Sequence, residues 1–260
     1  LGSLYANYSP NKLAKNQFLS FDFKLYDKIV EVFIPDVSIS ENTRFKGQIN
    51  ADAGKFELDF ISPTIIAYEN QIKNIKIDID NKNPIYNTFI SVDTIKNKNY
   101  KIADFNLINV TLNDTLFVRS EFKGGDQSLD KFDINLYHTI NLDKQSILGF
   151  KKSEIKFKEY TWFINENETN DNKIIFDKFL NNFDFQKISL SHNDQKMDFF
   201  GTMRDSTYKD FQLTFNDVDL KKVTPNIDSL SFSGKINGNI KYKQDKNNYD
   251  PQSSITIDSL

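Results

Sequence analysis

The chain has 260 residues, enough for one large all-β domain or two ordinary domains, so its length alone does not exclude a globular enzyme. Its 33 basic and 36 acidic residues give a net charge of -3 and form no basic block, which argues against a nucleic-acid partner. The absence of cysteine excludes a disulfide framework, a thiol nucleophile and a cysteinyl zinc site.

The composition favours strands joined by polar turns. The chain contains 24 Phe and 11 Tyr, and Asn, Asp and Lys are frequent. Aromatic residues suit strands, whereas Asn and Asp suit turns. Taken along the chain, the alternation of apolar and polar residues predicts strands with one apolar face at 19–34, 56–60, 75–79, 105–107, 116–122, 132–142, 155–157, 183–190, 211–215 and 232–242.

Polar clusters separate these strands. The clusters at 80–84, 96–99 and 165–172 are expected to be hairpin turns and edge loops. Residues 174–183 have an apolar spacing that also fits a helix, but Phe183 and Phe185 continue an alternating run. We therefore predict strand in this stretch, with a short helix as the alternative.

Local patterns return at long intervals, which is typical of arrays of repeated structural units. Phe-x-Gly-x-Ile-Asn occurs at 45–50 and at 232–237. The shorter Phe-x-Gly begins at Phe45, Phe122, Phe199 and Phe232, and Asp-Thr/Ser-Ile/Leu begins at Asp93, Asp114, Asp228 and Asp258. We expect residues 1–260 to form one continuous, elongated, repetitive antiparallel sheet that is a piece of a larger protein. The alternative is that strands of biased composition look alike.

The sequence offers little that could carry catalysis. His138 shares an apolar face with its neighbours, and His192 lies in a polar turn where we expect it to be solvated. Asp78 and Asp80 could imitate a glycosidase pair, but acids that alternate with isoleucines are typical of a wet strand face. The oxygens of the 165–172 loop suit calcium, although the spacing of an EF-hand is absent. We expect no enzyme, no cofactor and no metal.

An apolar strand face has to be covered. Either a second sheet covers it, as in a sandwich, or the sheet curls around a ligand. Periodicity alone does not separate these two arrangements. The many Phe residues favour a wide apolar trough over a tight core.

Within residues 150–242, the strand at 211–215 is followed by Asn-Asp-Val-Asp-Leu at 216–220, Val-x-Pro at 223–225 and Phe-x-Gly-x-Ile-Asn-Gly at 232–238. This order resembles the pattern of a strand, Asn-Val-Asp-Leu, Leu-x-Pro and Phe-x-Gly-x-Leu-Asn-Gly in the translocation and assembly module (TamB/AsmA-like) family, especially its Bacteroidetes members. One departure is the run Asn216-Asp217-Val218-Asp219, which has an extra acidic residue. The other residues that carry the resemblance are Phe150, Ser153, Ile155, Phe157, Trp162, Gln195, Gly201, Phe211, Leu213, Phe215, Leu220, Val223, Pro225, Leu230, Phe232, Gly234, Ile236, Asn237 and Gly238.

The resemblance implies an antiparallel sheet curled into an open groove, with few or no helices. It implies a periplasmic segment, anchored to the inner membrane by a region outside this chain, that moves phospholipids between the membranes. It also implies support of outer-membrane protein assembly through a β-barrel partner that contacts another region. The partner within the groove would be phospholipid acyl chains, and its expected lining is Ile75, Ile77, Ile79, Phe132, Ile134, Leu136, Phe211, Leu213, Phe215, Phe232 and Ile236.

Three alternatives stay open. The same lining residues would form an ordinary core between two sheets if the protein were an adhesin-like stalk. A carbohydrate-binding sandwich would be favoured if Trp162, Tyr160 and Tyr208 formed an exposed platform. The Asp-Thr/Ser-Ile/Leu repeats resemble an O-glycosylation signal of Bacteroidetes periplasmic proteins, with acceptors at Thr94, Thr115 and Ser229.

Overall fold

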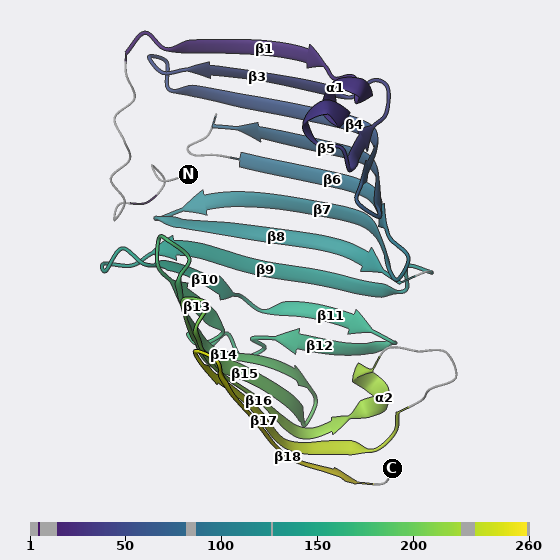
Figure 1. The fold of residues 1–260 in the computed structure, drawn as a ribbon, viewed down its shortest axis with the longest axis vertical. Helices are drawn as coiled ribbons and strands as arrows, with labels where there is room; N and C mark the ends of the chain where they lie inside the picture. The colour runs from purple at the N-terminus through teal and green to yellow at the C-terminus, as the bar shows by residue number, and fades with distance from the viewer. Residues whose placement is uncertain (1–4, 6–14, 82–86, 126, 225–231, 259–260) are drawn as a thin grey trace. The chain divides into compact units, whose positions relative to one another are not determined.

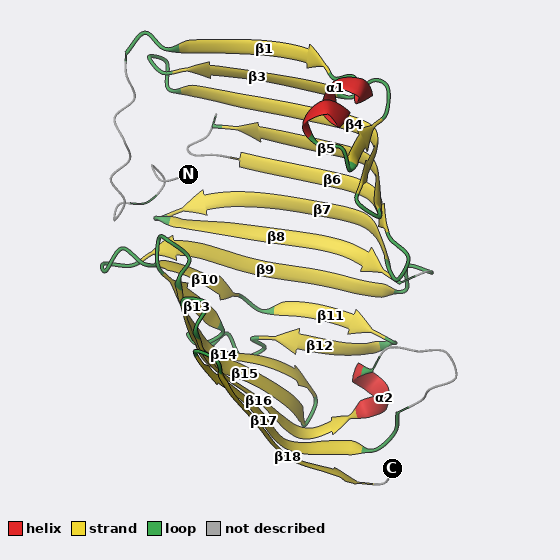
Figure 2. Ribbon diagram, viewed as in Figure 1, coloured by secondary structure: helices red, strands yellow, loops and turns green. Residues whose placement is uncertain are grey.

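The computed structural model describes residues 5, 15–81, 87–125, 127–224 and 232–258. Strands dominate this part of the chain, which also contains two short helices. Figure 2 colours the strands yellow and the helices red. The eighteen strands of the described residues belong to one sheet, and the strand pairs with a defined register are antiparallel. The prediction of an all-β, antiparallel fold with few helices is confirmed. The curling of the sheet into an open groove stays a prediction.

The chain divides into two compact units, residues 1–133 and 134–260. The boundary falls within β9 (Asp130–Ile140). The first unit contains β1 (Phe18–Lys24), α1 (Asp27–Phe33), β2 (Val37–Ile39), β3 (Arg44–Asn50), β4 (Lys55–Ala67), β5 (Asn70–Asp80), β6 (Asn87–Lys96), β7 (Lys101–Leu112) and β8 (Thr115–Gly124). In this unit β1 and β3 to β8 lie side by side (Figure 1).

The second unit contains short strands followed by long ones. Its elements are β10 (Ser146–Phe150), β11 (Ser153–Phe157), β12 (Tyr160–Ile164), β13 (Lys173–Phe176), β14 (Asn182–His192), β15 (Gln195–Arg204), β16 (Tyr208–Asp219), α2 (Leu220–Val223), β17 (Lys235–Asp245) and β18 (Asn248–Asp258). From β14 to β18 each strand pairs with the next along the chain. This succession of hairpins follows from the polar turns between alternating runs.

Cross-strand register aligns apolar residues into rows in the first unit. Phe45 pairs with Phe60, Phe60 with Ile77, Ile77 with Ile90, and Ile90 with Leu107. Because side chains alternate between the two faces of a strand, paired residues share a face. One row of apolar side chains therefore crosses five strands, from β3 to β7.

The opposite face of the same strands carries several charged residues. Lys46 pairs with Asp59, and Asp59 pairs with Asp78. Lys76 contacts the Asp78 carboxylate at 2.9 Å. Partial burial and the neighbouring Asp78 carboxylate raise the pKa of Asp59. The sheet of the first unit thus has one apolar face and an opposite face on which charged pairs lie beside exposed apolar residues, since Asp78 pairs with Phe89 and Phe89 with Ile108.

The predicted strand at 19–34 is wrong in its second half, which forms α1. The apolar residues Tyr26, Ile29, Val30 and Phe33 have the i, i+3, i+4, i+7 spacing of a helix and do not alternate, so the strand prediction extended the alternation of residues 19–25 too far. The Asp27 carboxylate accepts a hydrogen bond from the Ile39 N–H at 2.7 Å and so ties the helix to β2. None of the α1 residues is buried, and Phe33 is 80% exposed.

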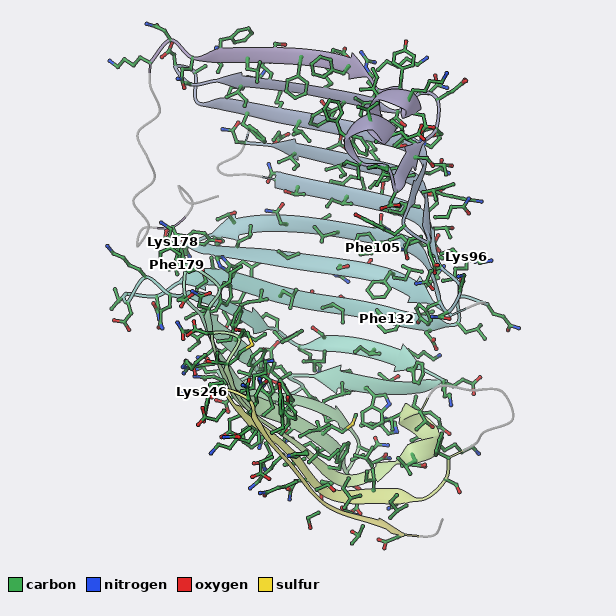
Figure 3. All side chains as sticks on the ribbon, viewed as in Figure 1. Lys96, Phe105, Phe132, Lys178, Phe179 and Lys246 are labelled. Carbon is green, nitrogen blue, oxygen red and sulfur yellow. The ribbon has the colours of Figure 1, made fainter. Side chains whose placement is uncertain are left out.

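The strand prediction for 174–183 is correct at the two ends of the stretch, and the alternative of a helix is wrong. These residues form β13, a turn and the start of β14. In the turn, the Asp177 carboxylate accepts hydrogen bonds from the N–H groups of Phe179 and Asn181, both at 3.0 Å. The turn closes because a local carboxylate satisfies backbone donors that a helix would otherwise use. Figure 3 labels Phe179 in this turn, where its side chain is exposed.

Candidate apolar ligand-binding face

The predicted lining residues of β5 lie on the apolar face of the first unit. Ile77 pairs with Phe60 and Ile79 with Leu58, whereas Ile75 pairs with the buried Ser62. The three isoleucines are partly buried, so each keeps some contact with solvent. The register brings them together, as the alternation predicts.

Aromatic rings extend this face on both sides of β5. Phe21 and Phe45 have ring centroids 4.9 Å apart, and Phe45 and Phe60 have centroids 6.2 Å apart. Near the other end of the unit, the rings of Phe122 and the predicted Phe132 stack with centroids 4.5 Å apart. Phe105 contacts Phe122 in turn at 6.0 Å, and Figure 3 shows Phe105 on β7 and Phe132 on β9.

Of these aromatic residues, only Phe132 is among the predicted lining residues. Phe45 and Phe122 carry a signal that could have identified them, because each opens a Phe-x-Gly repeat. Two residues along a strand lie on the same face, so each repeat places a glycine beside a phenylalanine on the apolar face.

The glycines of these repeats leave room for rings of the neighbouring strands. A Cβ atom on Gly47 would lie 2.5 Å from the Phe21 ring, and one on Gly124 would lie 3.0 Å from the Phe132 ring. The ring of Tyr100 also lies over Gly124. The Phe-x-Gly repeat therefore has a physical basis, since a ring of another strand occupies the space of the missing side chain.

The second unit has its own apolar face. The predicted residues Phe211, Leu213 and Phe215 pair with Gly201, Phe199 and Met197 of β15, respectively. All three predicted residues are partly buried. The rings of Phe176, Phe183, Phe185, Phe199 and Phe211 form a chain across β13 to β16 with centroid distances of 5.5 to 6.1 Å.

Ile134 and Leu136 lie on β9 and are partly buried. Leu136 pairs with Phe150, and the next residue on this face, His138, pairs with Leu148. The His138 ring lies 6.4 Å from the Phe176 ring, and burial lowers its pKa. His138 therefore belongs to the apolar face, where the neutral imidazole is favoured.

The last two predicted residues differ in their surroundings. Ile236 is 8% exposed and belongs to a core cluster with Trp162 and Val218, against which Phe215 also packs. Phe232 is 43% exposed and precedes β17, which begins later than predicted. Ile236 therefore contributes to a closed core rather than to an open face.

The extra acidic residue of the run 216–219 lies at an irregularity in the pairing of β16 with β17. The register between β16 and β17 shifts between Phe215 and Val218, and Asp217 has φ of 51°. The Asp217 N–H donates to the Asn237 side chain at 2.8 Å. The inserted residue thus forms a β-bulge, which rotates Val218 into the core. Pro225 and Leu230 lie outside the described residues.

Trp162 and His192 depart from the sequence-based expectations. Trp162 is 2% exposed, so it does not supply the exposed platform with Tyr160 and Tyr208 that would favour a carbohydrate-binding sandwich. His192 is partly buried and not solvated as expected, because its Nδ1 lies 2.7 Å from the Thr161 carbonyl oxygen. Its ring also lies 5.2 Å from the Trp162 ring.

The structure also bears on metal binding, membrane-spanning helices and the predicted glycosylation acceptors. The described residues contain no cluster of three or more His, Cys, Asp or Glu side chains that could hold a metal ion. Within the same residues, no helix is long and apolar enough to cross a membrane. Thr94 and Thr115 are partly buried, and Ser229 lies outside the described residues.

Comparisons with known proteins add no assignment. No family model matches the chain, and neither the curated proteins nor the solved structures contain a match. The resemblance to the TamB/AsmA-like family therefore stays a prediction.

Proposed function

We propose that this chain is a segment of an envelope protein that carries phospholipids between membranes, with acyl chains resting on its apolar faces. One observation carries the proposal. Phenylalanine and isoleucine side chains line one side of successive strands in each unit, yet most of them stay partly exposed. An extended apolar surface with residual exposure is typical of a binding surface.

The small number of buried apolar residues supports this proposal. Among the described residues, only Tyr5, Val92, Ala103, Trp162, Val218 and Ile236 are buried apolar side chains. A domain that covered its apolar faces with a second sheet would bury many more residues. The described strands instead belong to a single sheet, which leaves apolar area available for a ligand.

The energetics of acyl chains fit such a surface. Each methylene that leaves water gains about 0.8 kcal/mol, so a row of partly exposed phenylalanines lowers the free energy of an acyl chain between membranes. The chain needs to make no covalent bond for this function. The charged opposite face, with pairs such as Lys76–Asp78, suits contact with water in the periplasm.

The proposal includes regions beyond these residues. An inner-membrane anchor and a contact with an outer-membrane β-barrel assembly protein would belong to other parts of the protein. This chain would provide the surface along which lipid moves. Together with the β-barrel assembly protein, the whole protein would support outer-membrane protein assembly.

The experiment is native mass spectrometry with lipid extraction on protein purified from its own host envelope. Leu213→Asp places a charge on the apolar face of β16, whereas Gln212→Asp places the same charge on the opposite face of that strand. We expect phospholipid to accompany the native protein and the Gln212→Asp control, and to be lost from Leu213→Asp. Circular dichroism verifies that both variants remain folded.

A folded native protein without lipid would contradict the proposal and favour a structural stalk. Equal lipid content in the two variants would also contradict it, because the lipid would then not contact the β16 apolar face.

A further inference from the structure

A polar cleft in the second unit lies apart from the apolar residues. Its volume is about 440 Å³, and it is lined by the loop between β12 and β13 together with residues of β14, β15 and β16. We call it the amide cleft, because Asn165, Asn167, Asn172, Asn193, Gln195 and Asn216 all line it. The proposed lipid function uses none of these side chains.

The loop that forms one wall of the cleft is held by buried amides. Asn165 is buried, and its Nδ2 donates to the Phe150 carbonyl oxygen at 2.7 Å. Its Oδ1 accepts from the Thr169 N–H at 2.9 Å and from the Asn172 Nδ2 at 3.0 Å. Asn172 is also buried and accepts from the Ser189 N–H at 2.7 Å. A ligand would meet a preformed wall and would not have to order the loop.

The two lysines of the cleft, Lys187 and Lys196, share one carboxylate, that of Asp198. Asp198 lies 3.0 Å from the Lys187 Nζ and 3.3 Å from the Lys196 Nζ, and it accepts a hydrogen bond from Ser189 at 2.5 Å. Burial acts to raise the pKa of Asp198, but these donors and cations outweigh it and the pKa is lowered. The lysines are therefore paired with an ionised carboxylate, and because Glu166, Asp171 and Asp194 also line the cleft, acids outnumber lysines there and the cleft is a poor anion site.

Other side chains of the cleft keep hydrogen-bonding capacity. Asn167 and Asp171 make no side-chain hydrogen bond within the described part of the chain, and both are exposed. The Gln195 Oε1 accepts from the Asp219 N–H at 2.9 Å, which leaves its amide nitrogen as a donor. Asn216 donates to the Asp194 carbonyl oxygen at 3.5 Å, and its Oδ1 is an acceptor. The cleft thus offers donors and acceptors side by side.

Two β-bulges shape the cleft. The register shifts between Phe185 and Ile188 on β14, next to Lys187, and between Phe215 and Val218 on β16, next to Asn216. Bulges redirect side chains and are frequent beside binding sites. Here they bring strand residues to the same cleft as the loop.

The chemistry of the cleft selects a class of ligand. An acyl chain would cover the exposed side chains of Asn167, Asp171 and Asn216 without offering them hydrogen bonds, which is costly for polar groups removed from water. A sugar hydroxyl both donates and accepts, as does a side-chain amide. We propose that the amide cleft binds a neutral oligosaccharide through Asn167, Asp171, Gln195 and Asn216.

The test is isothermal titration calorimetry of the whole chain with cellohexaose, maltohexaose and chitohexaose, in buffer that contains EDTA. The variant is Asn167→Ala with Asp171→Ala, and the matched control is Asn181→Ala, an exposed asparagine in another turn of the same unit. We expect at least one oligosaccharide to bind. Its dissociation constant should rise about tenfold or more in the double variant, which corresponds to about 1.4 kcal/mol, and should not change in the control.

Three results would overturn the proposal. They are failure of all three oligosaccharides to bind at millimolar concentration, equal affinity in the double variant, and binding that appears only when calcium replaces EDTA. Circular dichroism of the double variant verifies its fold, and Asn167→Ala alone replaces it under the same criteria if the double variant unfolds.

Discussion

Two glycines of the Phe-x-Gly repeat should respond very differently to substitution by alanine. On Gly201, a Cβ atom would lie 2.2 Å from the Asp210 carbonyl oxygen and 2.8 Å from the Phe211 Cα, and φ at this residue is 153°. On Gly47, the nearest atoms belong to the Phe21 ring at 2.5 Å, and the nearest backbone atom is 3.2 Å away. The Phe21 ring on β1 can rotate away from Gly47. The backbone of β16 at Asp210 and Phe211 cannot move away from Gly201 without breaking its hydrogen bonds to β15.

The magnitudes follow from these contacts. Overpacking costs about 1–3 kcal/mol, and a strained backbone region costs about 1–3 kcal/mol more for a residue other than glycine. Gly201→Ala combines both costs, so we expect it to lower the free energy of unfolding by about 3 kcal/mol or more. Gly47→Ala requires only rearrangement of the Phe21 ring, so we expect a loss of about 1 kcal/mol or less.

The assay is urea unfolding followed by far-ultraviolet circular dichroism, with the fluorescence of Trp162 as a second probe. Trp162 is the only tryptophan and lies in the same unit as Gly201, so its fluorescence should report the Gly201→Ala transition. With a urea slope of about 1–3 kcal/mol per molar, the midpoint should fall by about 1 M or more. Equal midpoint shifts for the two variants would refute the assignment of different roles to the two glycines.

Three further predictions concern single side chains. Trp162→Ala should lower the free energy of unfolding, measured with denaturant, by about 3–5 kcal/mol. Trp162→Phe should lower it less, because the buried indole N–H has no hydrogen-bond partner among the described residues and its removal loses no hydrogen bond. The pKa of Asp59 is raised above the ordinary carboxyl value of 3.8. Its contribution to the free energy of unfolding is therefore complete below pH 3.8 and is lost as pH rises through the folded pKa. Asp59→Asn should therefore raise the urea midpoint at pH 7 more than at pH 3, and an equal change at both pH values would count against the raised pKa. Burial lowers the pKa of His138 below the ordinary imidazole value of 6.5. Its contribution to the free energy of unfolding is therefore present above pH 6.5 and is lost as pH falls through the folded pKa. Nuclear magnetic resonance titration should place its midpoint below 6.5, and a midpoint at or above that value would contradict its position on the apolar face.

Much of the candidate site could be predicted from the sequence. Ile75, Ile77 and Ile79 share a face because side chains alternate along a strand, and this geometry requires no knowledge of neighbouring strands. The same holds for Phe211, Leu213 and Phe215. Alternation does not show what fraction of each side chain is buried. Ile236 follows the same pattern, yet it lies in a core with Trp162 and Val218.

The sequence by itself determined the strand class, the apolar and charged faces, and the polar turns, because these depend on period-two geometry and local turn chemistry. Tertiary structure decided features that depend on contacts distant in sequence. The helix α1 is tied to β2 by the hydrogen bond that the Ile39 N–H donates to the Asp27 carboxylate. The bulge at Asp217 and the burial of His192 likewise require partners on other strands, namely Asn237 and Thr161. A one-residue bulge reverses the face of every later side chain, and only cross-strand hydrogen bonding fixes where it occurs.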